Sequence, residues 1–203
     1  MYPFFLFNSW DVAVNSIGNF LISDSRNHRI QLFNRDGHFI SRFSFDGINH
    51  SRYLKGLTTP RGVCFTPEGD IIITDFENHR LILIDGDMTR VLAAKGHEGA
   101  GMHEFCRPSG ICCDDDGRVI VADSKNQRVV TFSSQLEFLW ATEIRPTSIY
   151  GPFQQGHQVI DDKEKDRPSD VALLLDGRLI VLVETSPDSR DQCSKHKTFV
   201  QIY

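Results

Sequence analysis

Residues 70–84 read DIIITDFENHRLILI, and two further stretches of the chain closely resemble this one. Residues 71–75 and 80–84 are apolar runs separated by a short polar turn, a pattern typical of two short strands joined as a hairpin. Nearly the same text occurs as NFLISDSRNHRIQLF at residues 19–33 and as RVIVADSKNQRVVTF at residues 118–132. A unit that recurs at a regular interval predicts a repeat architecture.

An aspartate stands directly before the polar turn of each unit and defines the interval of the repeat. These aspartates are Asp24, Asp75 and Asp123, about 50 residues apart, which is the interval of a propeller blade with four strands. A glycine six residues before each aspartate, such as Gly69, suits a tight turn with positive φ. The other strands are predicted at 12–14, 62–65 and 110–113 (first strands), 30–33, 81–84 and 129–132 (third strands), and 39–43, 91–94 and 138–142 (fourth strands).

The fourth unit departs from this pattern. It begins near Arg167 and keeps predicted strands at 171–174 and 179–182, but Val183 stands where the other units have aspartate. An insertion at 184–197 then precedes a last predicted strand at 199–203. We therefore predict an all-β fold, a partial propeller of four blades with four antiparallel strands each, the last blade incomplete. Its parts are an irregular N-terminal stump at 1–8 and a propeller at 9–203, with blades at about 9–47, 59–96, 107–144 and 167–203.

The composition is that of a soluble globular protein. Of 203 residues, 40% are hydrophobic and 24% are charged. The formal net charge of −5 provides no global basic field for nucleic acid, so any polyanion site must be a local patch. The sequence has no apolar run of transmembrane length, and its apolar start lacks the basic region of a signal peptide. We expect a cytoplasmic chain with no membrane partner.

The cysteines favour reduced, buried thiols. There are five of them, an odd number, without the spacing of metal ligands. Cys112 and Cys113 are adjacent in a predicted strand and point to opposite faces, so they cannot share one tetrahedral metal. The full set is Cys64, Cys106, Cys112, Cys113 and Cys193.

Each anchor aspartate is followed by Asn three residues later and by Arg five residues later. Such a set can be read as catalytic or metal-binding, but its recurrence in every complete unit favours a structural role. We expect the aspartate to hydrogen-bond the turn and to pair with the arginine. His28 and His79 lie in the same turn of different units and predict no cluster of ligands. We therefore expect no metal site, no cofactor and no catalytic residue.

The repeat resembles a known family. The pattern Pro-x-Gly-Val, a glycine turn, an apolar strand, Asp, and Asn-His-Arg at 27–29 and 78–80 is similar to NHL repeats. Over residues 9–203 the text looks most like the C-terminal propeller of TRIM-NHL proteins, in the LIN-forty-one branch. The resemblance implies a ring of six blades, of which this chain would be the C-terminal four. It also implies a parent protein with an N-terminal RING-type E3 ubiquitin ligase domain, whereas this chain itself is expected to be no enzyme.

One face of the predicted blades combines cations, amides and aromatic rings. In a four-stranded blade, the turn between the second and third strands lies on the same face as the residues leading into the first strand. Glu77 is the exposed acidic exception there, and Trp10, Ser109, Gln127 and Arg167 contribute to the face. Cations can pair with phosphates, rings can stack on bases, and amides can read base edges. The predicted RNA-binding residues are Arg61, Phe76, Asn78, His79, Arg107, Asn27, His28, Arg26, Lys125 and Asn126.

Two functions follow from these observations. The resemblance implies an RNA-binding propeller that recognises a hairpin or a single-stranded element in mRNA, as the targeting module of a TRIM-type post-transcriptional regulator. DNA is not an expected partner. The alternative is a platform for protein–protein interaction without RNA, which the acidic net charge favours.

Overall fold

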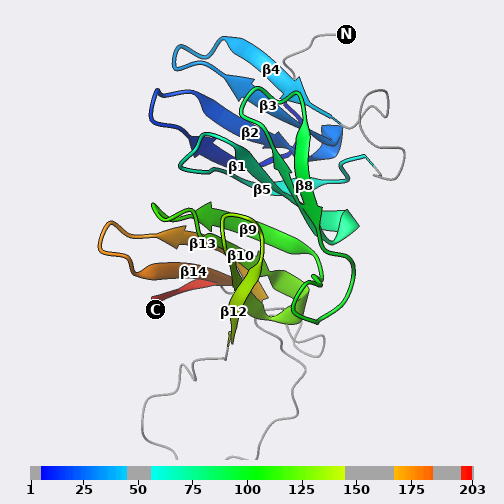
Figure 1. The fold of residues 1–203 in the computed structure, drawn as a ribbon, viewed down its shortest axis with the longest axis vertical. Coiled ribbons are helices and arrows are strands. Elements are labelled where there is room, and N and C mark those ends of the chain that lie inside the picture. Colours follow the sequence, from blue (N-terminus) through cyan, green and yellow to red (C-terminus); the bar gives the residue numbers. More distant parts are fainter. Residues whose placement is uncertain (1–5, 45–55, 145–166, 185–197, 203) are drawn as a thin grey trace, which may run out of the picture.

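The computed structural model describes residues 6–44, 56–144, 167–184 and 198–202, and within them it contains four antiparallel sheets (Figure 1). Each sheet is one blade, and the blades follow one another in chain order. Blade 1 consists of β1 (Ser9–Val14), β2 (Phe20–Asp24), β3 (Arg29–Phe33) and β4 (Phe39–Phe43), and blade 2 of β5 (Pro60–Phe65), β6 (Ile71–Asp75), β7 (Arg80–Ile84) and β8 (Val91–Lys95). Blade 3 consists of β9 (Pro108–Cys113), β10 (Val119–Asp123), β11 (Arg128–Phe132) and β12 (Phe138–Glu143), and blade 4 of β13 (Arg167–Leu173), β14 (Leu179–Glu184) and β15 (Thr198–Ile202).

The predicted blade architecture is confirmed, and the differences concern mainly the start of each first strand. The strands β1, β5, β9 and β13 begin two to four residues earlier than the sequence pattern indicates. A break in the pairing register lies in this added part, for example between Pro60 and Val63 opposite β6. Such a bulge interrupts the alternation of side chains, so the early residues do not read as strand. The insertion at 185–197 and Tyr203 lie outside the described residues.

The polar turn that follows each anchor aspartate is a short 3₁₀ turn. The three turns are η1 (Ser25–Asn27), η2 (Phe76–Asn78) and η3 (Ser124–Asn126). The next residue, His28, His79 or Gln127, has a left-handed backbone with φ of 53–55°. The tight turn therefore reverses the chain between the second and third strands of each blade.

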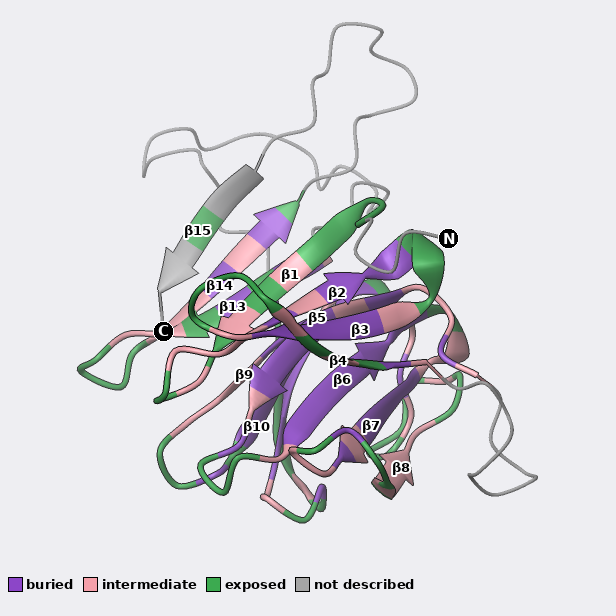
Figure 2. Ribbon diagram, turned by 90° about the horizontal axis from the view of Figure 1, so that it is seen from above, coloured by how far each residue is buried: buried purple, intermediate pink, exposed green. Residues whose placement is uncertain are grey.

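Apolar clusters fill the spaces between consecutive blades. In β6, Ile71 and Ile73 pack toward blade 1, whereas Ile72 packs toward blade 3. Because both faces of the second strand are covered, it is a continuous apolar run rather than an alternating one. Figure 2 shows the result, with β6 and β10 buried along their length and β1 mostly exposed or half-buried.

The two adjacent cysteines illustrate the same geometry. Cys113 packs with the cluster between blades 2 and 3, and Cys112 with the cluster between blades 3 and 4, as predicted for neighbours in a strand. The Sγ of Cys113 lies 3.1 Å from the Sγ of Cys64 in the neighbouring blade.

No helix among the described residues has both the length and the apolar character that a membrane crossing requires.

The first strands of successive blades lie side by side and leave little room between their backbones. A Cβ atom at Gly62 would lie 2.5 Å from the carbonyl oxygen of Ser109, and one at Gly110 would lie 2.5 Å from the Cα of Asp170. Both distances are shorter than any real contact of a Cβ atom. Glycine at these two positions therefore permits the close approach of neighbouring blades.

A fully buried carboxylate organises each of the first three blades. One oxygen of Asp24, Asp75 or Asp123 accepts the backbone N–H of the residue seventeen positions earlier, at 2.7–2.8 Å. The other oxygen accepts the Asn amide at 2.8–2.9 Å and the Arg Nε at 2.6–2.8 Å. The predicted structural role of the Asp–Asn–Arg set is thus confirmed. The residues whose N–H groups are bound are Phe7, Thr58 and Cys106.

These contacts extend the first repeat into the predicted stump. Phe7 has the same hydrogen bond to Asp24 that Thr58 has to Asp75. The repeated contacts therefore begin at Phe7, two residues before the predicted start of blade 1, although residues 6–8 form no strand.

We predict that Asp75→Ala destabilises the fold by about 3–5 kcal/mol, because it leaves the buried Arg80 guanidinium without its counter-ion and removes the acceptor of three hydrogen bonds. Urea unfolding followed by circular dichroism measures the loss. The control is Glu137→Ala, which breaks the exposed ion pair with Lys95 and should cost at most about 1 kcal/mol. Equal, small losses in the two variants would show that the carboxylate does not organise the blade.

A half-buried carboxylate, that of Asp11, lies on β1 and faces the first strand of blade 2. The Asp11 carboxylate accepts the N–H of Val63 at 2.9 Å and that of Val12 at 2.7 Å. Burial raises the pKa of Asp11 to about 6, and the negative charge of Asp170 acts in the same direction. The protonated form is therefore favoured in the folded state more than in the unfolded chain.

This shift predicts a pH-dependent stability. Because the folded pKa lies above the unfolded one, the contribution of Asp11 is complete below about pH 4 and is lost as the pH rises through 6. Asp11→Asn removes the titration, so between pH 4 and pH 7.5 its stability relative to wild type should rise by as much as about 3 kcal/mol. Urea unfolding of both proteins at several pH values measures the difference. A relative stability that is constant with pH, as expected for the exposed control Asp36→Asn, would refute the assignment.

Candidate nucleic-acid interface

The turns and the residues leading into the first strands lie together, as predicted, and we call this surface the top rim. In blade 2 the N–H of Glu77 donates to the carbonyl of Thr58 at 3.2 Å, and in blade 3 the N–H of Lys125 donates to that of Cys106 at 3.0 Å. The N–H of Arg26 makes the same bond to Phe7 in blade 1. The top rim thus consists of η1, η2 and η3, the described residues just before β1, β5 and β9, and the first residues of β1, β5 and β13.

The three predicted asparagines serve the turns. The amides of Asn27, Asn78 and Asn126 donate to the anchor aspartates, and those of Asn78 and Asn126 also donate to the carbonyls of Gly56 and Gly99. Their N–H groups are therefore engaged within the protein. The prediction that these amides read base edges is not tested by this geometry, but it would compete with the contacts that shape the turn.

The two predicted histidines connect neighbouring blades. The Nδ1 atom of His28 accepts the backbone N–H of Thr59 at 3.0 Å, and that of His79 accepts the N–H of Arg107 at 3.3 Å. Both acceptors lie on the turn of one blade, and both donors lie just before the first strand of the next. Each imidazole therefore helps to fix the angle between two blades.

A cation stacked between two aromatic rings lies where blades 1 and 2 meet on the top rim. The Arg61 guanidinium carbon lies 3.8 Å from the ring centre of Trp10 and 3.4 Å from that of Phe76. Burial in this stack lowers the pKa of Arg61 to about 10, and its Nε has no partner among the described residues. Trp10 remains 44% exposed, whereas Phe76 is only 6% exposed.

Phe76 is also a departure from the repeat. The other two blades have Ser25 and Ser124 at this position, and their hydroxyls donate to the carbonyls of Pro60 and Pro168 in the next blade. In blade 2 the hydroxyl is replaced by an aromatic ring under two arginines, since Arg107 also lies over it at 5.5 Å. Blade 2 exchanges a hydrogen bond between blades for a cation–π contact.

Further cations gather beside this stack. The nearby charges of Arg167 and Arg107, together with burial, lower the pKa of Lys125. Arg107 also pairs with Glu77 at 3.2 Å, an exposed contact that is worth little on its own. Arg26 lies apart, 5.6 Å over the ring of Phe7. The structure therefore groups Arg61, Arg107, Lys125 and Arg167, and leaves Arg26 and the blade 1 turn outside this group.

The acidic residues of the top rim are more numerous than the sequence indicated. Besides Glu77, the charge of Glu184 acts on Arg61, and Glu98 lies beside His79. Glu98 was missed because it belongs to the glycine-rich segment between β8 and β9, whose path the repeat does not specify. The amide of Asn126 and the guanidinium of Arg128 donate to the carbonyls of Gly99 and Ala100 and hold that segment against blade 3.

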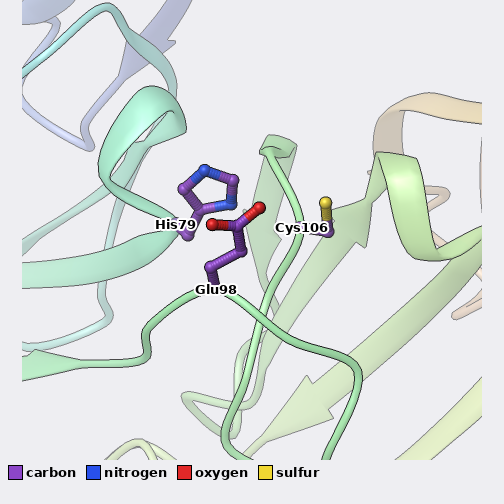
Figure 3. Close-up of side chains that lie close together, drawn as sticks. All are labelled: His79, Glu98 and Cys106. Atoms are coloured by element: carbon purple, nitrogen blue, oxygen red, sulfur yellow. The ribbon is translucent and has the colours of Figure 1, made fainter.

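Glu98 forms a cluster with His79 and Cys106 (Figure 3). One potential ligand atom from each residue lies within 4.8 Å of the others. Burial and the carboxylates of Asp123 and Glu98 raise the pKa of the Cys106 thiol. No such cluster was predicted, and its only signal in the sequence is the cysteine at the position that is Thr58 in blade 2 and Phe7 in blade 1.

Comparisons with known proteins agree with the repeat. The model of the NHL repeat matches residues 10–33, 57–82 and 105–132. Protein wech of Drosophila melanogaster is 52% identical over 165 residues, which are 81% of this chain and 19% of that protein. The chain thus spans about a fifth of the length of this relative.

Solved structures agree with the fold. Virginiamycin B lyase from Staphylococcus aureus has a TM-score of 0.59 and 13% identity, over 94% of this chain and 55% of its own. A chain of a nidogen/laminin complex has a TM-score of 0.59 and 19% identity, over 98% of this chain and 67% of its own. At such low identity the likeness concerns the fold alone. The chain thus contains three NHL repeats between residues 10 and 132, and the described residues fold as consecutive blades of a β-propeller.

Proposed function

We propose that the top rim binds RNA, and that Arg107, Lys125 and Arg167 hold its phosphates. The observation that carries this proposal is the placement of three cations where blades 2, 3 and 4 meet. The N–H of Lys125 donates to the carbonyl of Cys106, next to Arg107, and the hydroxyl of Ser124 donates to the carbonyl of Pro168, next to Arg167. A local concentration of positive charge attracts polyanions. Such a patch also meets the requirement that a chain with net charge −5 bind nucleic acid only locally.

Within this proposal, Trp10 replaces Phe76 as the stacking residue. Trp10 is 44% exposed, so part of its ring is accessible to a base, whereas Phe76 lies under Arg61 and is 6% exposed. Stacking on an aromatic ring is tolerant of sequence and suits single-stranded RNA. The guanidinium of Arg61 stacks on the ring of Trp10 and holds that ring beside the other cations of the top rim.

A second function is favoured by a different observation. Glu77 already pairs with Arg107, and Glu184 lies near Arg61, so part of the positive charge is compensated within the protein. An interaction module of the propeller type could instead dock a protein on this mixed surface. The place of this chain in a TRIM-type regulator of the LIN-forty-one branch, the RING ligase of its parent, and its cytoplasmic location stay predictions.

We predict that Arg107→Glu combined with Lys125→Glu weakens RNA binding at least about 10-fold. The double variant should also lose one to two phosphate contacts, so its binding constant should fall less steeply with salt concentration. Fluorescence anisotropy with a labelled single-stranded RNA, a labelled hairpin and the DNA of the same sequence, from low to physiological salt, provides the measurement.

The control is Arg118→Glu combined with Arg178→Glu, which changes the net charge by the same amount. These exposed arginines lie on the turns between first and second strands, at the opposite end of blades 3 and 4, and pair with aspartates there. The control pair should keep nearly all of the affinity. Equal losses in both pairs would mean non-specific attraction, and absence of salt-dependent binding by the wild type would leave protein docking as the function of the top rim.

A further inference from the structure

We propose that His79, Glu98 and Cys106 form a binding site for a divalent transition-metal ion, with Zn²⁺ as the preferred ion. Figure 3 shows the three side chains converging from the turn of blade 2, the segment between β8 and β9, and the residues before β9. The site would join blade 2 to blade 3 at the top rim. It goes beyond the proposed binding of RNA and does not depend on it.

The backbones of His79 and Cys106 are held in place before any metal binds. His79 follows the 3₁₀ turn with φ of 55°, and its N–H donates to the carbonyl of Phe76. The N–H of Cys106 donates to the buried Asp123 carboxylate at 2.7 Å, and its carbonyl accepts the N–H of Lys125. Because the protein has already fixed these two residues, binding a metal would cost little further ordering.

The hydrogen bond of His79 also identifies the nitrogen that would bind. Its Nδ1 accepts the N–H of Arg107, the residue after Cys106, at 3.3 Å. The lone pair of Nδ1 therefore points toward the Cys106 side of the cluster. A metal ion would replace this long hydrogen bond with a coordinate bond, and Nε2 would keep its proton.

The donor set determines which metal fits. An imidazole nitrogen, a thiolate and a single carboxylate suit Zn²⁺ and similar ions, whereas Mg²⁺ and Ca²⁺ require mostly oxygen ligands. The ligands of tetrahedral Zn²⁺ lie roughly 3.3–3.8 Å apart, given bonds of about 2.0–2.3 Å. The observed separations between the potential ligand atoms, up to 4.8 Å, would shorten to that range if the exposed Glu98 side chain moved by about 1 Å. Water would take the fourth position.

At the equivalent positions that the structure describes, the other blade boundaries have different side chains and therefore serve as internal comparisons. Between blades 1 and 2, His28 has the same hydrogen bond, but Thr58 takes the place of Cys106. In blade 3, Gln127 takes the place of His79 with the same left-handed backbone. Cys106→Thr and His79→Gln are thus substitutions that the fold already accepts elsewhere in this chain.

The test is titration of the reduced, tag-free chain with Co²⁺ after removal of metals by a chelator. We expect one ion per chain, with the thiolate-to-cobalt charge-transfer absorption and the visible bands of tetrahedral Co²⁺, and displacement of these bands by Zn²⁺. Isothermal titration calorimetry with Zn²⁺ should give micromolar or tighter affinity. Glu98→Gln and His79→Gln should each weaken Zn²⁺ at least about 10-fold, and Cys106→Thr should abolish the charge-transfer band.

Two control variants separate this site from other thiols and histidines. His28→Gln alters the equivalent residue of blade 1, and Cys113→Ser alters the thiol 3.1 Å from Cys64, so both should leave the titration unchanged. A charge-transfer band that survives in Cys106→Thr, or that disappears in Cys113→Ser, would assign the metal to a different thiol and overturn the proposal. Absence of stoichiometric binding by the wild type would overturn it as well.

Discussion

The buried anchor carboxylate is the interaction on which the rest of the structure depends. In each of the first three blades it joins the N–H of a residue seventeen positions earlier to two groups that follow it closely, the amide of the turn and an arginine of the third strand. A carboxylate removed from water must have its lone pairs satisfied, so these groups cannot separate without a large free-energy cost. This requirement places the turn and the residues leading into the first strand at the same end of every blade, and so creates the top rim.

A consequence is that the residues repeated among the first three blades serve the structure first. Asn27, Asn78 and Asn126 serve the anchors, and His28 and His79 fasten one blade to the next. The candidates for function are the residues that break the repeat. Phe76 replaces a serine, Cys106 replaces a threonine, and Glu98 comes from a segment outside the repeat. Within a repeat protein, the neighbouring blades show what each such residue has replaced.

The sequence predicted the fold better than it predicted the site. The strands β6 and β7 were placed to the residue, because apolar runs between turn residues define them on both sides. The bulged starts of β5 and β9 were missed, since a bulge leaves no alternation to detect. The prediction that the turns and the residues leading into the first strands share one face of the blades is confirmed, because this arrangement follows from the topology of a four-stranded blade.

The contacts on that face depend on side-chain packing that spacing does not report. No pattern in the sequence indicates that Arg61 covers Phe76 and leaves Trp10 as the exposed ring. The sequence also does not place Glu98 beside His79, since the path of the segment between β8 and β9 is set by contacts with blade 3, such as the hydrogen bonds of Asn126 and Arg128 to its carbonyls.

Hydrogen exchange of three backbone amides tests the central role of the anchors most directly. The N–H groups of Phe7, Thr58 and Cys106 lie in segments without strand pairing, and their acceptor is a buried carboxylate. We predict that they exchange as slowly as amides in the middle of β6 and β10. Exchange at the rate of exposed loops, with the strand amides still protected, would contradict the claim that these carboxylates hold the blades together.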